Sequence, residues 1–138
     1  MILLDTNVLI YASDEQSKLC RWARRMIAEG VSGEGAAVNA VSLAEVCVGD
    51  AEPQTVADRI RSWGVAVVDV PAAAAEVCAC AYLAYRKRRK ADSGKDAPAV
   101  PLPDFFIGAQ AQVMGWTLAT ADEGRFKTYF PAVPLRTP

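Results

Sequence analysis

The chain has 138 residues, of which 52% are hydrophobic and 22% charged, and its formal net charge is −1. This size and balance fit one soluble globular domain and exclude general disorder. Because the chain has no histidine, Ser-His-Asp and Cys-His nucleophiles and imidazole general bases are excluded.

Short apolar runs alternate with segments of helical pattern along the chain. Strands are predicted at residues 2–4, 36–39, 65–70, 116–120 and 133–135. Helices are predicted at residues 17–29, from 42 onward, at 54–63, from 72 to 86 or beyond, and at 104–114, with a loop at 91–103. Strands interleaved with helices predict one α/β domain over residues 1–138, with a parallel sheet covered on both faces. Ligands gather at the carboxyl ends of the strands in such sheets.

Targeting and zinc-binding signals are weak in this sequence. No apolar run reaches the length of a membrane span without a charge, and the first run is interrupted too early for a signal peptide. We therefore expect a cytoplasmic protein with no membrane partner. Cys78-Ala79-Cys80 is one residue short of the usual zinc-binding spacing, so the thiols are expected to be structural.

The first carboxylate, Asp5, stands between two apolar runs in "MILLDTNVLIYAS". An ionised group is costly to bury there unless something pairs with it. Two interpretations are open at this point. Asp5 either caps a helix that begins at Thr6, or it points out of the end of a strand and holds a metal ion.

Three further acidic residues share this setting, because Glu45, Asp104 and Asp122 each follow a strand or open a helix. Singly, Asp104 and Asp122 fit helix N-caps, and Glu45 fits a capping-box partner of Ser42. Together, four carboxylates in one cleft repel one another unless a cation neutralises them. Mg²⁺ or Mn²⁺, as one or two ions, prefers such oxygen ligands and suits phosphodiester hydrolysis.

A run of five bases interrupts the otherwise mildly acidic chain. It suits contact with a polyanion such as RNA, or it is a solvated helix end that leads into a loop. The run is Arg86, Lys87, Arg88, Arg89 and Lys90.

Four motifs in series carry a family resemblance. "LLDTNVLI", "SLAEV", "PLPDFFIGAQA" and "TLATADEGRFKTYFP" resemble the acidic motifs of PIN-domain ribonucleases, and the chain length and ending are most similar to VapC-type toxins of bacterial toxin–antitoxin pairs. The resemblance implies a three-layer α/β/α fold with a parallel five-stranded sheet, and Mg²⁺- or Mn²⁺-dependent endoribonuclease activity. It also implies an antitoxin partner and a homodimer. Its site residues in this chain would be Asp5, Glu45, Asp104 and Asp122, supported by Thr6, Asn7 and Thr120, with Arg125 as a further RNA contact.

Two departures from the family pattern bear on activity. Many relatives have an arginine where this chain has Ala121, and many have a histidine where it has Gln110. Either change would alter substrate contact or weaken the last motif, which leaves a non-catalytic PIN-like module that binds RNA or a partner as an alternative. Haloacid-dehalogenase-type phosphatases also begin with a strand ending in aspartate, but they place a second acid where this chain has Asn7.

Overall fold

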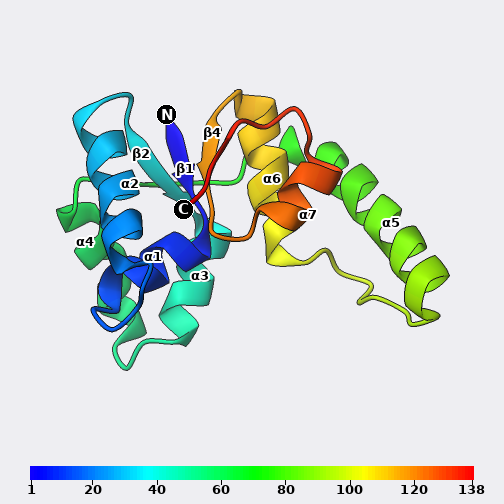
Figure 1. The fold of residues 1–138 in the computed structure, drawn as a ribbon, viewed down its shortest axis with the longest axis horizontal. Helices are drawn as coiled ribbons and strands as arrows, with labels where there is room; N and C mark the ends of the chain where they lie inside the picture. The colour runs from blue at the N-terminus through cyan, green and yellow to red at the C-terminus, as the bar shows by residue number, and fades with distance from the viewer.

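The computed structural model describes all 138 residues, which form five strands and seven helices (Figure 1). The strands are short and begin with the first residues of the chain. They are β1 (Ile2–Leu4), β2 (Ala36–Asn39), β3 (Ala66–Val68), β4 (Thr117–Ala119) and β5 (Leu135–Arg136). The helices are α1 (Thr6–Ser13), α2 (Cys20–Ser32), α3 (Ala40–Val48), α4 (Pro53–Ser62), α5 (Ala74–Ser93), α6 (Pro103–Met114) and α7 (Glu123–Tyr129).

All five strands join one sheet in the order β3-β2-β1-β4-β5, and every neighbouring pair is parallel. The strand β1 is central, and Leu4 at its carboxyl end is in register with Ala119 of β4. The predicted α/β fold with a parallel five-stranded sheet is therefore confirmed. Because all strands run the same way, their carboxyl ends form one edge of the sheet.

Alternate residues of β1 face opposite layers of helices. Ile2 and Leu4 pack into a core shared with α1, α2 and α4, whereas Leu3 packs into a core shared with α5, α6 and α7. Successive side chains of a strand point to opposite faces, so a strand that is covered on both sides must be apolar throughout. Figure 1 shows the two groups of helices on either side of the sheet.

The longest helix differs from its prediction. The helix α5 continues to Ser93 and ends at Gly94, whose φ of 68° suits glycine. The five basic residues therefore lie on α5, and the loop that was predicted to start at residue 91 starts after Ser93. In Figure 1 the end of α5 reaches beyond the rest of the molecule. No helix of the structure is both long enough and apolar enough to cross a bilayer.

The start of α3 also differs from its prediction. The expected cap was Ser42, but Asn39 is the N-cap, and its Oδ1 accepts a hydrogen bond from Ser42 N at 2.9 Å. Asn39 is the last residue of β2, so the chain turns directly from strand into helix. Ser42 and Glu45 therefore lie inside α3 and form no capping box.

The helix α7 was not predicted, and it packs closely against α6. Gly108 of α6 lies against the ring of Phe130, which follows α7, and a Cβ at position 108 would overlap that ring. Glycine thus allows the two helices to approach, and this approach brings α7 beside the first turn of α6.

Candidate active site

Asp5 lies at the end of β1 with only 3% of its surface exposed. Its Oδ1 accepts a hydrogen bond from Thr6 N at 2.7 Å, so Asp5 is the N-cap of α1. Its Oδ2 accepts hydrogen bonds from Thr120 Oγ1 at 2.7 Å and from Asn7 Nδ2 at 2.8 Å. The capping interpretation is therefore correct but accounts for one oxygen only, and three groups fix the carboxylate.

Burial raises the pKa of Asp5 from its ordinary value of 3.8 to about 6. The hydrogen bond from Thr120 opposes this rise, and the negative charges of Asp104 and Glu45 add to it. Both carboxylates thus lie near enough to Asp5 to disfavour its ionised form. A cation at this position would reverse that effect.

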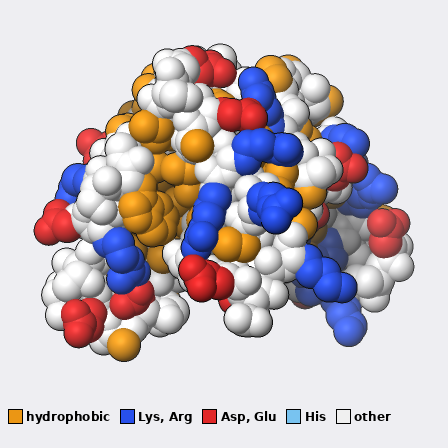
Figure 2. Space-filling model, turned by 60° about the vertical axis from the view of Figure 1, so that its left-hand side comes forward, with side chains coloured by type: hydrophobic (Ala, Val, Ile, Leu, Met, Phe, Trp, Pro, Cys, Tyr) orange, Lys and Arg blue, Asp and Glu red, His pale blue; other side chains and the backbone are white.

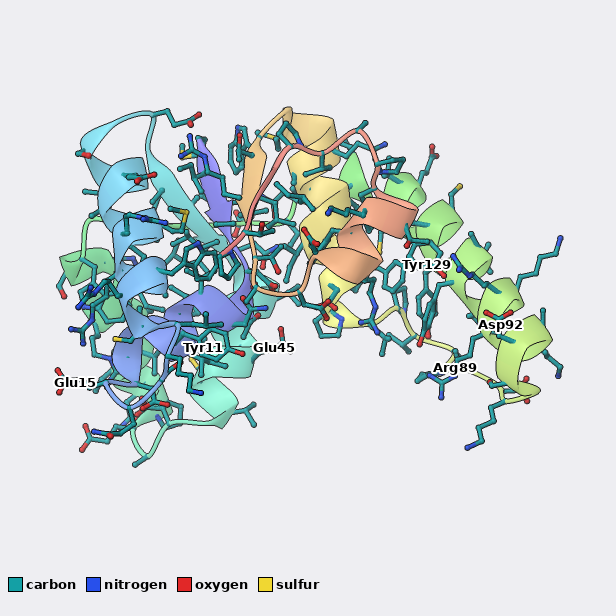
Figure 3. The ribbon with its side chains drawn as sticks, in the orientation of Figure 1. Tyr11, Glu15, Glu45, Arg89, Asp92 and Tyr129 are labelled. Atoms are coloured by element: carbon teal, nitrogen blue, oxygen red, sulfur yellow. The ribbon has the colours of Figure 1, made fainter.

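Glu45 is an exposed residue of α3 that is tied to α1. Its Oε1 accepts a hydrogen bond from Thr6 Oγ1 at 2.7 Å, so Thr6 contacts Asp5 through its backbone and Glu45 through its hydroxyl. Figure 3 shows Glu45 beside α1, near the end of the central strands. Thr6 therefore links the carboxylates of Asp5 and Glu45, which is a geometry that suits the supporting role expected of it.

Asp104 lies in the first turn of α6, whose N-cap is Leu102. Its Oδ2 accepts a hydrogen bond from Arg125 Nη1 of α7 at 2.7 Å, and both side chains are about one-third exposed, at 27% and 30%. The expectation that Asp104 is itself an N-cap is thus wrong.

The fourth acidic residue, Asp122, is exposed and precedes α7. It occupies the N-cap position, but its side chain makes no capping hydrogen bond. Its backbone N donates to Thr120 Oγ1 at 3.0 Å, which links it to the hydroxyl that binds Asp5. In addition, Ala121 N donates to Asn7 Oδ1 at 3.2 Å.

The structure thus brings Glu45 and Asp104 each within electrostatic reach of Asp5 and links the backbone of Asp122 to the Thr120 hydroxyl. No three acidic or cysteine side chains converge closely enough to hold a metal ion together in this arrangement. Because the carboxylates lie at the carboxyl edge of the sheet and Asp104 is not used as an N-cap, hard-cation binding remains the chemistry that their oxygen donors fit.

Gln110 is buried, with 1% of its surface exposed. Its Oε1 accepts from Asn39 Nδ2 at 3.0 Å, and its Nε2 donates to the carbonyl oxygen of Asp69 at 2.9 Å. Both polar ends of the Gln110 side chain are thus bonded within the chain, and its effect on substrate contact stays a prediction. Asn39 was not among the predicted site residues, although an asparagine that ends a strand is a sequence signal for a cap.

The basic run lies farther along α5, as the positions of Arg89 and Asp92 in Figure 3 show. Arg88 pairs with Asp92 at 3.7 Å and Lys90 with Asp96 at 3.0 Å. Arg86 and Lys87 form no ion pair within the chain.

Arg89 connects the basic run to the acidic residues through one tyrosine. Its Nη1 donates to Tyr85 Oη at 2.9 Å, and the Tyr85 ring lies under the guanidinium of Arg125 at 5.3 Å. Tyr85 was not among the predicted site residues, because a tyrosine on an alanine-rich helix gives no functional signal by itself.

Residues 2–130 match the model of the family described as PIN domain. No curated protein matches the chain.

Several solved structures have a similar fold over nearly the whole chain. FitAcB from Neisseria gonorrhoeae is 25% identical with a TM-score of 0.62, covering 100% of this chain and 98% of that one. VapBC-1 from nontypeable Haemophilus influenzae is 19% identical with a TM-score of 0.66, covering 99% and 98%. VapBC2 from Rickettsia felis, which is bound to a DNA fragment from its promoter, is 21% identical with a TM-score of 0.62, covering 100% and 99%.

Proposed function

The chain belongs to the PIN-domain family, and from that premise we propose that it is a Mg²⁺- or Mn²⁺-dependent endoribonuclease that acts as the toxin of a toxin–antitoxin pair. In this proposal residues 1–138 form a single PIN domain. The observation that carries the proposal is Asp5, a buried carboxylate whose pKa is raised to about 6 beside two more carboxylates. Such a cluster is costly to ionise without a counter-charge.

No three of the carboxylates converge on one point, but their donor chemistry fits a hard divalent cation. Asp5, Glu45, Asp104 and Asp122 offer only oxygen donors, and a cation would offset the repulsion that raises the pKa of Asp5. In the proposal these four carboxylates hold one or two ions. Bound there, Mg²⁺ or Mn²⁺ would supply positive charge that polarises an attacking water and the leaving oxygen of the phosphodiester.

The other polar residues of the site hold the carboxylates in place. Thr120 and Asn7 donate to one oxygen of Asp5, while Thr6 joins Asp5 to Glu45. Locked orientations reduce the reorganisation that a reaction would otherwise require. In the proposed reaction water attacks phosphorus and the P–O3′ bond breaks, which leaves a 5′-phosphate and a 3′-hydroxyl.

The proposed substrate, RNA, would be bound by basic side chains near the site and on α5. Arg125 is the nearest, because it already touches Asp104. On α5, Arg86 and Lys87 are free of ion pairs, and Arg89 points to Tyr85. Phosphate contacts of this kind give affinity and position without reading the base sequence.

The proposed protein partner is an antitoxin, because the solved relatives include a toxin–antitoxin complex from Klebsiella pneumoniae. A groove between α1, α2 and α4, whose apolar lining includes Ile27, Val31 and Trp63, suits an apolar segment of the partner. Figure 2 shows hydrophobic side chains gathered on one face, with Lys and Arg around them. We also propose a homodimer in the cytoplasm.

The test is cleavage of RNA by the purified chain with Mg²⁺, with Mn²⁺ and with EDTA. Asp5→Asn should abolish cleavage, whereas Asp14→Asn, a matched change at the exposed end of α1, should not. Full activity in EDTA, or unchanged activity of Asp5→Asn, would contradict the proposal.

The second candidate is a non-catalytic PIN-like module that binds RNA or a partner. The observation in its favour is that no three acidic side chains converge on one point. It predicts RNA binding without cleavage in either metal, which the same assay would reveal.

A further inference from the structure

Arg125 is the one cationic side chain that pairs with any of the four site carboxylates. Its Nη1 lies 2.7 Å from Asp104 Oδ2, whereas Asp5, Glu45 and Asp122 have no ion-pair partner. The guanidinium therefore binds a carboxylate oxygen of Asp104 that a bound cation would need as a ligand.

Two aromatic rings hold Arg125 at this place independently of Asp104. Its guanidinium carbon lies 5.3 Å from the centroid of the Tyr85 ring and 5.8 Å from that of Phe105. These distances are within the range of cation–π attraction. Tyr85 and Phe105 are themselves packed together, with centroids 5.2 Å apart. Arg125 can thus release Asp104 and still remain beside the site.

The ion pair contributes little to the stability of the folded chain. Both partners are about 30% exposed, and partly exposed pairs of this kind contribute about 0–1 kcal/mol. The charge of Asp104 acts on Asp5, so the ion pair points to a role in the balance of charge at the site.

We propose that Arg125 is a built-in competitor of the divalent cation for Asp104, and so lowers the affinity of the site for metal. This inference rests on the proposed metal site. Removal of its charge should tighten cation binding, because the site would then keep one more uncompensated negative charge. The released guanidinium would lie over Tyr85, where it can bind a phosphate of the substrate.

The test compares three variants by calorimetric titration with Mn²⁺, without RNA. Arg125→Gln removes the charge and keeps similar length, and it should bind Mn²⁺ on the order of tenfold more tightly than the unmodified chain. Arg125→Lys keeps the charge and should stay close to the unmodified chain.

Lys127→Gln is the matched control. It removes the same charge from the same helix, but Lys127 is 62% exposed and pairs with Glu123 at 2.8 Å. It should leave Mn²⁺ binding unchanged. Equal melting temperatures of the Gln variants in EDTA would show that both remain folded.

Unchanged or weaker Mn²⁺ binding by Arg125→Gln would overturn the inference, and so would equal tightening by Lys127→Gln. Absence of Mn²⁺ binding in all variants would overturn both the inference and the proposed metal site. If Arg125→Gln binds Mn²⁺ more tightly but the unmodified chain does not cleave RNA, the inference stands and the proposed nuclease function fails.

Discussion

Acidification from pH 7 to pH 5 should stabilise the folded chain when no divalent cation is present. The pKa of Asp5 is about 6 in the folded chain, against 3.8 as its ordinary value. A carboxyl group with a raised pKa contributes stability that is fully present below the unfolded pKa and is lost as the pH rises through the folded pKa. Protonation of Asp5 therefore favours the folded state within this window.

The size of the effect follows from the two pKa values. The full difference between the folded and unfolded pKa values corresponds to about 3 kcal/mol in the free energy of unfolding. About 1.3 kcal/mol of this is gained between pH 7 and pH 5. Because Asp5 is 3% exposed, solvent screening reduces this little. In a domain of this size the gain should raise the melting temperature by about 4 °C.

Of the groups with shifted pKa values, Asp5 alone changes its protonation state between pH 5 and pH 7. The chain has no histidine. The pKa values of Glu34 and Asp50 are lowered, by the N-terminal amine and by the Glu52 N–H together with Arg59 respectively, so both groups stay ionised. Burial raises the pKa of Cys78 above 9.0, so its thiol stays protonated.

The assay is urea unfolding in EDTA at pH 5, 6 and 7, with Asp5→Asn as the comparison. The variant keeps the acceptor for Thr6 N but presents an amide N–H₂ to Asn7 Nδ2, so its absolute stability should also change. The pH slope is therefore the informative quantity, and it should vanish in the variant. Equal stability of the unmodified chain at pH 5 and 7, or an unchanged slope in Asp5→Asn, would refute the argument.

Three further substitutions test other parts of the structure. Gly108→Ala should destabilise the chain by about 1–3 kcal/mol in urea unfolding, because the added methyl group overlaps the Phe130 ring. Gln110→Leu should cost about 1–3 kcal/mol in the same assay, since it leaves Asn39 Nδ2 without its buried acceptor; no loss would show that this network is dispensable. Glu45→Gln keeps the acceptor for the Thr6 hydroxyl, so its stability should change by less than about 1 kcal/mol, while metal-dependent RNA cleavage should fall by at least about tenfold.

The sheet was predictable because its strands are covered on both faces. Ile2, Leu3 and Leu4 are all buried, and a run without alternating polar residues is typical of a parallel sheet. The strand positions in turn predicted that Asp5 and Asp122 lie at the same edge. Local sequence was sufficient for these two residues, because Asp5 directly follows β1 and Asp122 comes three positions after the end of β4.

The features that were missed depend on contacts between distant segments. The helix α7 is only seven residues long, contains Gly124 and buries Phe126 alone, so it has no clear amphipathic pattern. The position of Arg125 follows from the packing of α7 against α6, across 21 residues of sequence from Asp104. Likewise, Asn39 took the capping role expected of Ser42 because the strand continues without a linker into α3.

The hydrogen bond from Thr120 to Asp5 joins residues that are 115 positions apart. It depends on β4, which can pair with β1 only after the segment between them has been synthesised. During synthesis on the ribosome, Asp5 therefore leaves the exit tunnel together with Thr6 and Asn7 but long before Thr120. A chain cut short before β4 lacks Thr120, Asp122 and Arg125 at once. A protein whose proposed activity is to cut RNA would thus be harmless to the machinery that makes it until nearly all of the chain has emerged.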